Sequence, residues 1–263
     1  MFGRAALAVA LSAALSAGAQ AALVAQWDFD ELAGSTAAPT VGAVSGTLLG
    51  DASFVGGGIT GGAISMTRLG SGMVDFGTGL FPSGPFSVQA WVKTTDAAAG
   101  APFSHHTATN VSGWILALGD INDGCGGGAA TASFYVAYPC SGHSGTALND
   151  GVWHQLVGTY DGTQSRIYVD GVLASTSAGG NPLNTPPATT HLLAGGATVG
   201  STPANSYGGL LDKMAIWDTA LSGEAVAALH EAATTPTTTT PEPGTLALLG
   251  AGALGLARLR RRK

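Results

Sequence analysis

The sequence has few charged residues, and basic ones are especially scarce between its two ends. Charged side chains make up 10% of the 263 residues, and only ten are Lys or Arg. Six of those ten are Arg4 and five residues within 258–263, so residues 22–233 hold four basic and fifteen acidic side chains, a net charge of −11. No basic patch is available to neutralise phosphates. Nucleic acid is therefore not expected as a partner, whereas divalent cations and neutral polymers are compatible with this charge.

Glutamate is scarce too, with only Glu31, Glu224, Glu231 and Glu242 in the chain. Hydrolysis of a glycoside by the retaining mechanism needs two carboxyl groups about 5 Å apart. These four residues fall at a strand end, on a terminal helix and in the tail, so they form no such pair. The chain also lacks a Gly-x-Ser-x-Gly elbow, a His-Glu-x-x-His helix and a phosphate-binding glycine loop. We find no catalytic residue and expect a protein that is not an enzyme.

The two ends of the chain resemble transport signals rather than parts of a fold. Residues 1–21 combine a basic residue, an apolar stretch and an Ala-Gln-Ala cleavage pattern, which predicts a secretory signal peptide. A Thr/Pro linker over 234–240 precedes residues 241–263, which hold an apolar run and an Arg cluster. That run of about 12 residues is short of the ~20 that span a bilayer comfortably. We expect a short apolar helix that inserts in the inner membrane only transiently.

Cysteine occurs twice, at Cys125 and Cys140. Export places both in an oxidising compartment, where a disulfide is the expected state. The bridge would close a glycine-rich loop of about 15 residues and stabilise the fold by roughly 3 kcal/mol in the chain-entropy model. The alternative is a pair of free, buried thiols.

Glycine, in contrast, is abundant, with 41 residues, and it punctuates alternating apolar and polar segments. Residues 153–175 contain two Asp-Gly turns, at 161–162 and 170–171, which predict a three-stranded antiparallel meander. Further strands are expected at 23–29, 86–93, 131–138 and 209–217, and Ser222 should cap a short helix. Residues 96–102 are expected to be a loop. One buried face per strand predicts an all-β, two-sheet antiparallel sandwich over residues 22–233.

Four blocks in this order resemble the LamG-like jelly roll of the concanavalin A-like lectin/glucanase domains: Leu23–Glu31, Phe86–Lys93, Trp153–Val172 and Gly209–Ser222. The resemblance implies two curved sheets packed face to face, with the first and last strands as neighbours. The stretch between residues 94 and 149 departs from any pattern that we could align. In this fold, ligands bind at loops or on the concave sheet, which are the parts least like the family.

The tail resembles the PEP-CTERM sorting signal, because Pro241, Glu242 and Pro243 precede the apolar run and the Arg cluster. The resemblance implies an exosortase-type processing enzyme as a partner. It also implies a Gram-negative bacterium and a location in the cell envelope, at the outer surface or in the extracellular matrix. A plain membrane anchor that stays in place is the alternative.

Asp212 is expected on an apolar strand face with Leu210, Met214 and Ile216, where a carboxylate needs hydrogen bonds or a cation. The resemblance places Asp28 and Asp30 of the first strand beside it. Three carboxylates with backbone carbonyls could hold a structural Ca²⁺. The alternative is that Asp212 accepts backbone N–H bonds or caps a turn.

Aromatic side chains in the middle of the chain could stack on sugar rings. The candidates for such a platform are Trp91, Trp114, Tyr135 and Tyr138, with Asp120, Asn122 and Asp123 as nearby hydrogen-bonding residues. The alternative is that these aromatics fill the core. His105 and His106 are expected in a loop, and adjacent residues seldom share a metal.

Three functions follow for the exported domain. The first is a non-catalytic binding or adhesion protein whose ligand is an extracellular polysaccharide or a surface protein. The second is a glycan hydrolase or lyase that would use Asp120, Asp123, His143 and Tyr135. The third is a structural matrix protein without a ligand.

Overall fold

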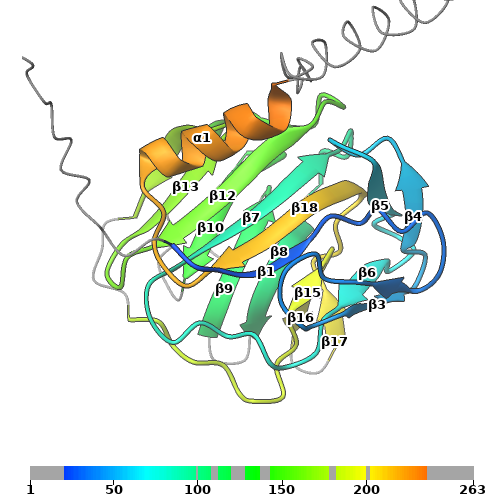
Figure 1. The fold of residues 1–263 in the computed structure, drawn as a ribbon, viewed down its shortest axis with the longest axis horizontal. Coiled ribbons are helices and arrows are strands. Elements are labelled where there is room, and N and C mark those ends of the chain that lie inside the picture. The colour runs from blue at the N-terminus through cyan, green and yellow to red at the C-terminus, as the bar shows by residue number, and fades with distance from the viewer. Residues whose placement is uncertain are drawn as a thin grey trace, which may run out of the picture.

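A computed structural model describes residues 21–98, 100–107, 112–119, 128–136, 143–177, 182–199 and 202–235 (Figure 1). Within these residues the chain forms two β-sheets packed face to face, and one helix lies outside them. The all-β sandwich predicted from the sequence is therefore confirmed. All strand pairs are antiparallel except one parallel contact, between Thr198 and Thr107.

The first sheet contains eight strands in the described chain, in the order β14-β13-β12-β7-β18-β5-β4, with β1 also paired to β18. Their bounds are β1 Leu23–Trp27, β4 Ser53–Gly56, β5 Gly62–Met66, β7 Phe86–Lys93, β12 His154–Tyr160, β13 Ser165–Val169, β14 Val172–Thr176 and β18 Gly209–Trp217.

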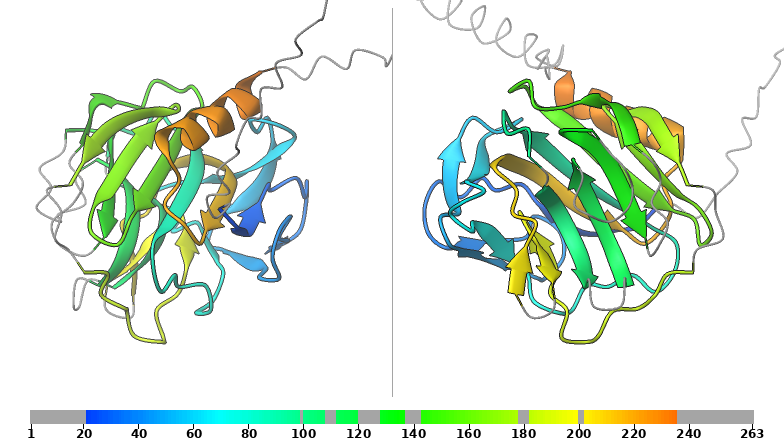
Figure 2. Two further views of the ribbon diagram at one scale, coloured as in Figure 1. Left: turned by 60° about the vertical axis from the view of Figure 1, so that its left-hand side comes forward. Right: turned by 180° about the vertical axis from the view of Figure 1, so that it is seen from behind.

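The second sheet contains ten strands among the described residues, and Figure 2 shows it from behind. Its path is β11-β10-β9-β8-β15-β6-β3-β2, with β16 paired to β8 and β17 paired to β16. The bounds are β2 Thr36–Ala37, β3 Gly46–Leu49, β6 Met73–Asp75, β8 Gly100–Thr107, β9 Ser112–Leu118, β10 Thr131–Val136, β11 His143–Ala147, β15 Leu193–Ala194, β16 Ala197–Val199 and β17 Thr202–Ala204.

The predicted meander is present as β12, β13 and β14, which pair in succession. Asp170 and Gly171 have φ angles of 49° and 79°, the left-handed conformation that a two-residue type I′ turn requires. Ile167 of β13 packs in the core between the sheets, and Tyr168 packs on the opposite face. The alternation in the sequence therefore predicted both the hairpin and its buried face.

β1 and β18 are neighbours, as the family resemblance implied. The expected face of β18 is wrong, however, because the strand bulges between Asp212 and Ala215 and Lys213 has a φ of 43°. A bulge inserts an extra residue and shifts the alternation by one position. Leu211, Met214 and Ile216 consequently face the core, and Asp212 does not share their cluster.

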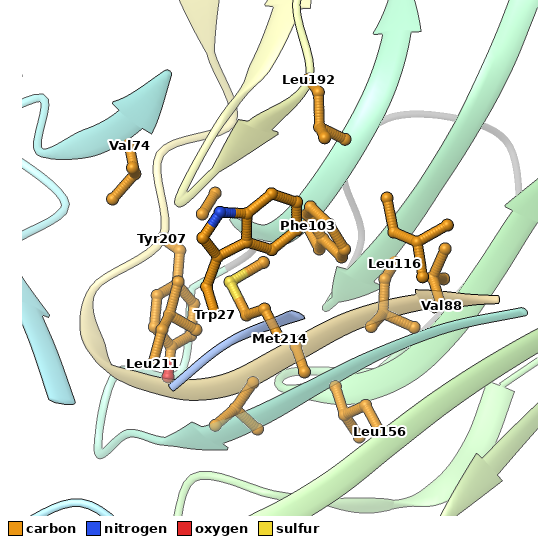
Figure 3. Close-up of a cluster of buried hydrophobic side chains, with 14 of the residues drawn as sticks. Trp27, Val74, Val88, Phe103, Leu116, Leu156, Leu192, Tyr207, Leu211 and Met214 are labelled. Carbon is orange, nitrogen blue, oxygen red and sulfur yellow. The ribbon is translucent and has the colours of Figure 1, made fainter. Parts of the chain in front are cut away.

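The core between the sheets is built around Trp27, which is fully buried (Figure 3). Its ring lies 4.2 Å from the ring of Phe76, measured between centroids, and 6.4 Å from that of Phe103. The alternating apolar residues of β7 enter this core, as expected, and they are Phe86, Val88, Ala90 and Val92. Large aromatic side chains thus fill the space between two short-stranded sheets, where they bury most apolar area per residue.

Helix α1, Gly223–Thr234, covers the outer face of the first sheet (Figure 1). Ser222 is its N-cap, as predicted, and its hydroxyl accepts a bond from the Ala225 N–H. Val226 is fully buried in a cluster with Tyr168 of β13 and Trp217 of β18. This face of the sandwich is therefore closed by the chain itself. Among the described residues, no helix is long and apolar enough to cross a membrane.

The expected loop over 96–102 is wrong in part, because β8 begins at Gly100 and continues through both adjacent histidines. His105 and His106 are buried strand residues that point to opposite faces, since neighbours alternate on a strand. Several other predictions concern residues outside the described ones: the signal peptide, Cys125 and Cys140, Tyr138, the linker, and the tail with Pro241, Glu242 and Pro243.

Candidate functional site

A pocket of about 360 Å³ opens at one end of the sandwich, where β7 ends and β18 begins. Its volume lies within the range of ligand-binding pockets. Four segments that are distant in sequence line it, and they are Met66–Arg68, Lys93–Asp96, Gly151 and Gly208–Leu210. We call this the loop-end pocket.

Strand register brings these segments together. Gly209 pairs with Met66 of β5, and Leu210 pairs with Lys93 of β7. Gly209 has a φ of 146°, and a Cβ there would lie 2.4 Å from the Lys93 carbonyl oxygen, so only glycine permits this approach. The Thr94 hydroxyl donates to the Gly208 carbonyl at 2.6 Å and ties the two walls together.

Tyr207 supports the pocket from below. Its side chain is 2% exposed, and its hydroxyl lies 3.2 Å from the carbonyl oxygens of Lys93 and Leu210. Burial raises the pKa of this phenol, so Tyr207 stays a neutral donor. Tyr207 thus links the backbones of two lining residues, Lys93 and Leu210.

Arg68 and Asp96 form an ion pair at the pocket wall. The Arg68 Nε lies 3.1 Å from Asp96 Oδ2, and the side chains are 45% and 35% exposed. Asp96 is fixed because its other oxygen accepts from the Ala98 N–H at 2.9 Å and its own N–H donates to the Thr94 hydroxyl at 2.9 Å. Among the described residues the terminal nitrogen atoms of Arg68 have no partner, and Lys93 has no ion pair.

The lining residues carry two cations and one carboxylate. Asp96 is the single carboxylate among them, and it is paired with Arg68. The pocket also offers the hydroxyl of the exposed Thr95, with Leu69 92% exposed and Val152 51% exposed on the adjoining loops. Sequence reasoning missed this site, although two of the four basic residues of the domain line it.

Two of the three acids predicted to hold calcium, Asp30 and Asp212, border the turn over residues 57–62, whereas Asp28 lies beside Gln26 and Lys213, and each of the three is used by the protein. Asp212 is fully buried; its Oδ2 accepts from the Ile59 N–H at 2.8 Å and its Oδ1 from the Lys213 N–H at 2.6 Å. Asp30 accepts from the Gly62 N–H at 2.7 Å, and Asp28 lies 3.8 Å from the Lys213 ammonium. Amide donors and an ammonium point at the oxygens that a cation would need.

No group of three or more His, Cys, Asp or Glu side chains suited to a metal occurs in the part of the chain that the structure describes. The described residues fit the alternative in which Asp212 accepts backbone hydrogen bonds, and the calcium ion stays a prediction. Burial raises the pKa of Asp212 to about 7, against the lowering effect of the two N–H groups.

The proposed sugar platform is not supported for the aromatics that the structure describes. Trp114 of β9 is fully buried against Phe86 and Phe103 in the core between the sheets. Trp91 of β7 is 1% exposed and stacks on His230 of α1, with 5.4 Å between ring centroids. Both are core fillers, which was the alternative. The exposed fraction of Tyr135 is 3%, and its ring meets that of His106 edge-on at 5.8 Å.

Two of the residues proposed for the hydrolase or lyase lie on neighbouring strands of the second sheet. Tyr135 lies on β10, and His143 lies on the neighbouring edge strand β11 with its Nδ1 3.4 Å from the Thr131 hydroxyl. Asp120, Asn122 and Asp123 are outside the described residues. Neither Tyr135 nor His143 lines the loop-end pocket.

The fold and the sequence place the chain in a known class. Residues 69–227 match the model of the concanavalin A-like lectin/glucanases superfamily, and the chain belongs to that family. Residues 239–262 match the PEP-CTERM protein-sorting motif, which indicates export to the envelope or beyond in a Gram-negative bacterium and implies processing by an exosortase. No curated protein matches the sequence.

Several solved structures share the fold. Domain 4 of AbnA, an extracellular arabinanase from Geobacillus stearothermophilus solved with arabinotriose, aligns with a TM-score of 0.62 at 20% identity over 80% of this chain and 98% of that one. The Trypanosoma rangeli sialidase aligns at 0.56 and 16% identity, over 79% of this chain and 32% of the enzyme. The receptor binding domain of botulinum neurotoxin type G aligns at 0.50 and 16% identity, over 80% and 51%.

Proposed function

We propose that this protein is an exported, non-catalytic binding protein that attaches to extracellular polysaccharide at the cell surface through its loop-end pocket. The sorting motif supports the location, and the lectin/glucanase family supports a glycan ligand. A surface-protein ligand, a glycan hydrolase or lyase on the same fold and a matrix protein without a ligand are the competing functions.

One observation carries the proposal. The pocket has polar groups placed on rigid strand ends, yet it holds one carboxylate and that carboxylate is paired with Arg68. A pocket of this kind can fix the hydroxyls of a sugar by hydrogen bonds but has no second acid to cleave the glycosidic bond. The AbnA neighbour, whose domain 4 was solved with arabinotriose, is compatible with this use of the fold.

A glycan array with the purified full-length chain tests the function. We expect retention of one or more polysaccharides with no shortened oligosaccharide released during long incubation. Release of product would favour the hydrolase or lyase, and an array without any bound glycan would favour a protein ligand or the matrix protein.

A pair of matched variants tests the location of the site. Thr95 is exposed and lines the pocket, so Thr95→Tyr should fill part of the pocket volume and reduce glycan retention. Thr176 is an exposed residue at the end of edge strand β14, three strands away from β7, so Thr176→Tyr is the control. Equal retention by both variants would place the ligand elsewhere on the domain.

A further inference from the structure

The four basic side chains of the domain are used in two different ways. Arg166 donates from one terminal nitrogen to Asp161 at 2.8 Å and from the other to Gln164 at 2.9 Å. Lys213 lies beside Asp28 at 3.8 Å. Both therefore face acceptors of the protein itself. The other two, Arg68 and Lys93, line the loop-end pocket.

Arg68 keeps its binding edge free. The contact with Asp96 uses Nε, and the two terminal nitrogen atoms make no hydrogen bond to the residues described. Those atoms form the fork that recognises a carboxylate through two parallel hydrogen bonds. Because Asp96 is itself held by the Ala98 N–H, it fixes the guanidinium in place before any ligand binds.

The acids beside the pocket are already engaged. Asp51 accepts from the N–H of Thr67 at 3.1 Å and from the hydroxyl of the same residue. Asp150 accepts from the Val152 N–H at 3.0 Å and lies 3.2 Å from His154 Nε2. The pocket lining thus holds two cations and one carboxylate, a net charge of +1, in a domain with a net charge of −11.

We propose that the loop-end pocket selects polysaccharides that carry carboxylate groups, with Arg68 binding the carboxylate through its two terminal nitrogens and Lys93 adding a second positive charge. This inference rests on the proposed function and narrows its ligand class. Neutral hydroxyls of the same sugar would bind the exposed Thr95 and the backbone at the pocket wall.

Two trisaccharides that differ only at the C6 carboxylate provide the probe, namely trigalacturonate and galactotriose. We expect the full-length chain to bind the acidic trimer about tenfold more tightly at low salt, since a hydrogen bond to a charged group is worth about that factor or more. The preference should shrink as salt screens the charges. Equal affinity for both trimers would overturn the inference and leave the proposed function standing, whereas failure of every glycan to bind would end the proposed function itself.

Variants distinguish the hydrogen bonds of the Arg68 guanidinium from the effect of the net charge of the pocket. The double variant R68Q/D96N keeps the net charge of the pocket because it removes one positive and one negative group, and it should lose the preference for trigalacturonate. D96N alone should bind the acidic trimer at least as well as the wild type. R166Q removes an ion pair at β13, outside the pocket lining, and is the control, with affinity changed less than about twofold.

Three results would contradict the inference. The first is an R68Q/D96N protein that keeps the preference, and the second is an R166Q protein that loses it equally. The third is tight binding of octaglutamate, because a pocket that reads charge without sugar would not be a polysaccharide site. A K93Q variant gives an independent measurement, and unchanged melting temperatures confirm that each variant is folded.

Discussion

Strand β5 runs between the two charged regions of the domain, and these regions differ in how their polar atoms are used. At Gly62, the first residue of β5, the backbone and the preceding turn donate N–H bonds to Asp30 and Asp212. At Met66, its last residue, the loop-end pocket begins, and there Arg68 keeps two nitrogen atoms without a partner in the described chain.

This contrast shows why carboxylates alone are a poor guide to a site. The turn over 57–62 has the more concentrated charge, but the protein itself satisfies it, so its role is to hold β1, β5 and β18 together. The pocket has fewer carboxylates, and it has hydrogen-bond donors that no group in the described chain uses. A ligand can bind only to donors and acceptors that the protein itself does not satisfy.

The largest expected effect is on the pH dependence of stability, through Asp212. Its pKa is raised from 3.8 to about 7 in the folded protein, so the folded state binds a proton that the unfolded state releases near pH 4. The stabilisation from this proton is full below about pH 4 and is lost as pH rises through 7, up to about 4 kcal/mol. In Asp212→Asn, the unfolding free energy measured by urea denaturation should therefore fall less between pH 4 and pH 8 than in the wild type.

His154 is the control for that slope. It lies 2.7 Å from Asp170 and 3.2 Å from Asp150, and hydrogen bonding to Asp170 raises its pKa, so its stabilisation is also lost as pH rises. His154→Gln should remove a smaller part of the slope and leave the Asp212 part intact. An Asp212→Asn protein with the slope of the wild type would contradict the assignment.

The next effect compares a glycine at each region. A Cβ on Gly58 would lie 1.8 Å from the Gly62 carbonyl oxygen and 2.7 Å from Asp212 Oδ2, so Gly58→Ala must open the turn, and we expect a loss of about 3 kcal/mol. At Gly208 in the pocket the nearest atoms would be 3.1 Å away, and Gly208→Ala should lose less than about 1 kcal/mol. Equal losses of unfolding free energy for Gly58→Ala and Gly208→Ala would contradict the view that the turn is tightly packed and the pocket is open.

A smaller effect comes from truncating one carboxylate in each region. Asp212→Ala leaves the N–H groups of Ile59 and Lys213 without their acceptor, and we expect a loss of about 2 kcal/mol at pH 5, where this position carries little charge in either protein. Asp96→Ala should lose less than about 1 kcal/mol because water reaches the pocket. If denaturation curves showed a larger loss for Asp96→Ala than for Asp212→Ala, the pocket rather than the turn would be the region that stabilises the fold.

Much of the fold could be predicted because its long strands alternate cleanly. β7 and β18 have the expected bounds, and the Asp170-Gly171 turn fixed one hairpin. β8 was missed altogether, because Gly100, Pro102 and two histidines hide the alternation of a strand that is buried on both faces. The two-residue strand β15 exists only through pairing with the distant strands β6 and β8, which no local pattern encodes.

The site was beyond sequence reasoning for a related reason. Arg68, Lys93 and Gly209 are brought together by strand register, and register is a tertiary property. The scarcity of basic residues was a usable signal, since a domain with four of them places two in one pocket. Asp212 was assigned to the wrong face because a bulge at a non-glycine residue leaves no trace in the period-two pattern.

The smallest expected effect is the change in melting temperature when calcium is added. It also tests the comparison between the turn over 57–62 and the loop-end pocket. An ion held at 100 times its Kd would stabilise the fold by about 2.7 kcal/mol. Since the Asp212 oxygens accept N–H bonds and Asp28 lies beside Lys213, we expect no gain in melting temperature when Ca²⁺ is added after chelation, with Mg²⁺ as the control. A gain in melting temperature that is lost in Asp212→Ala but kept in Asp96→Ala would support the calcium prediction. In that case the turn over 57–62 would have rearranged around the ion, and its carboxylates would bind the ion instead of the N–H groups.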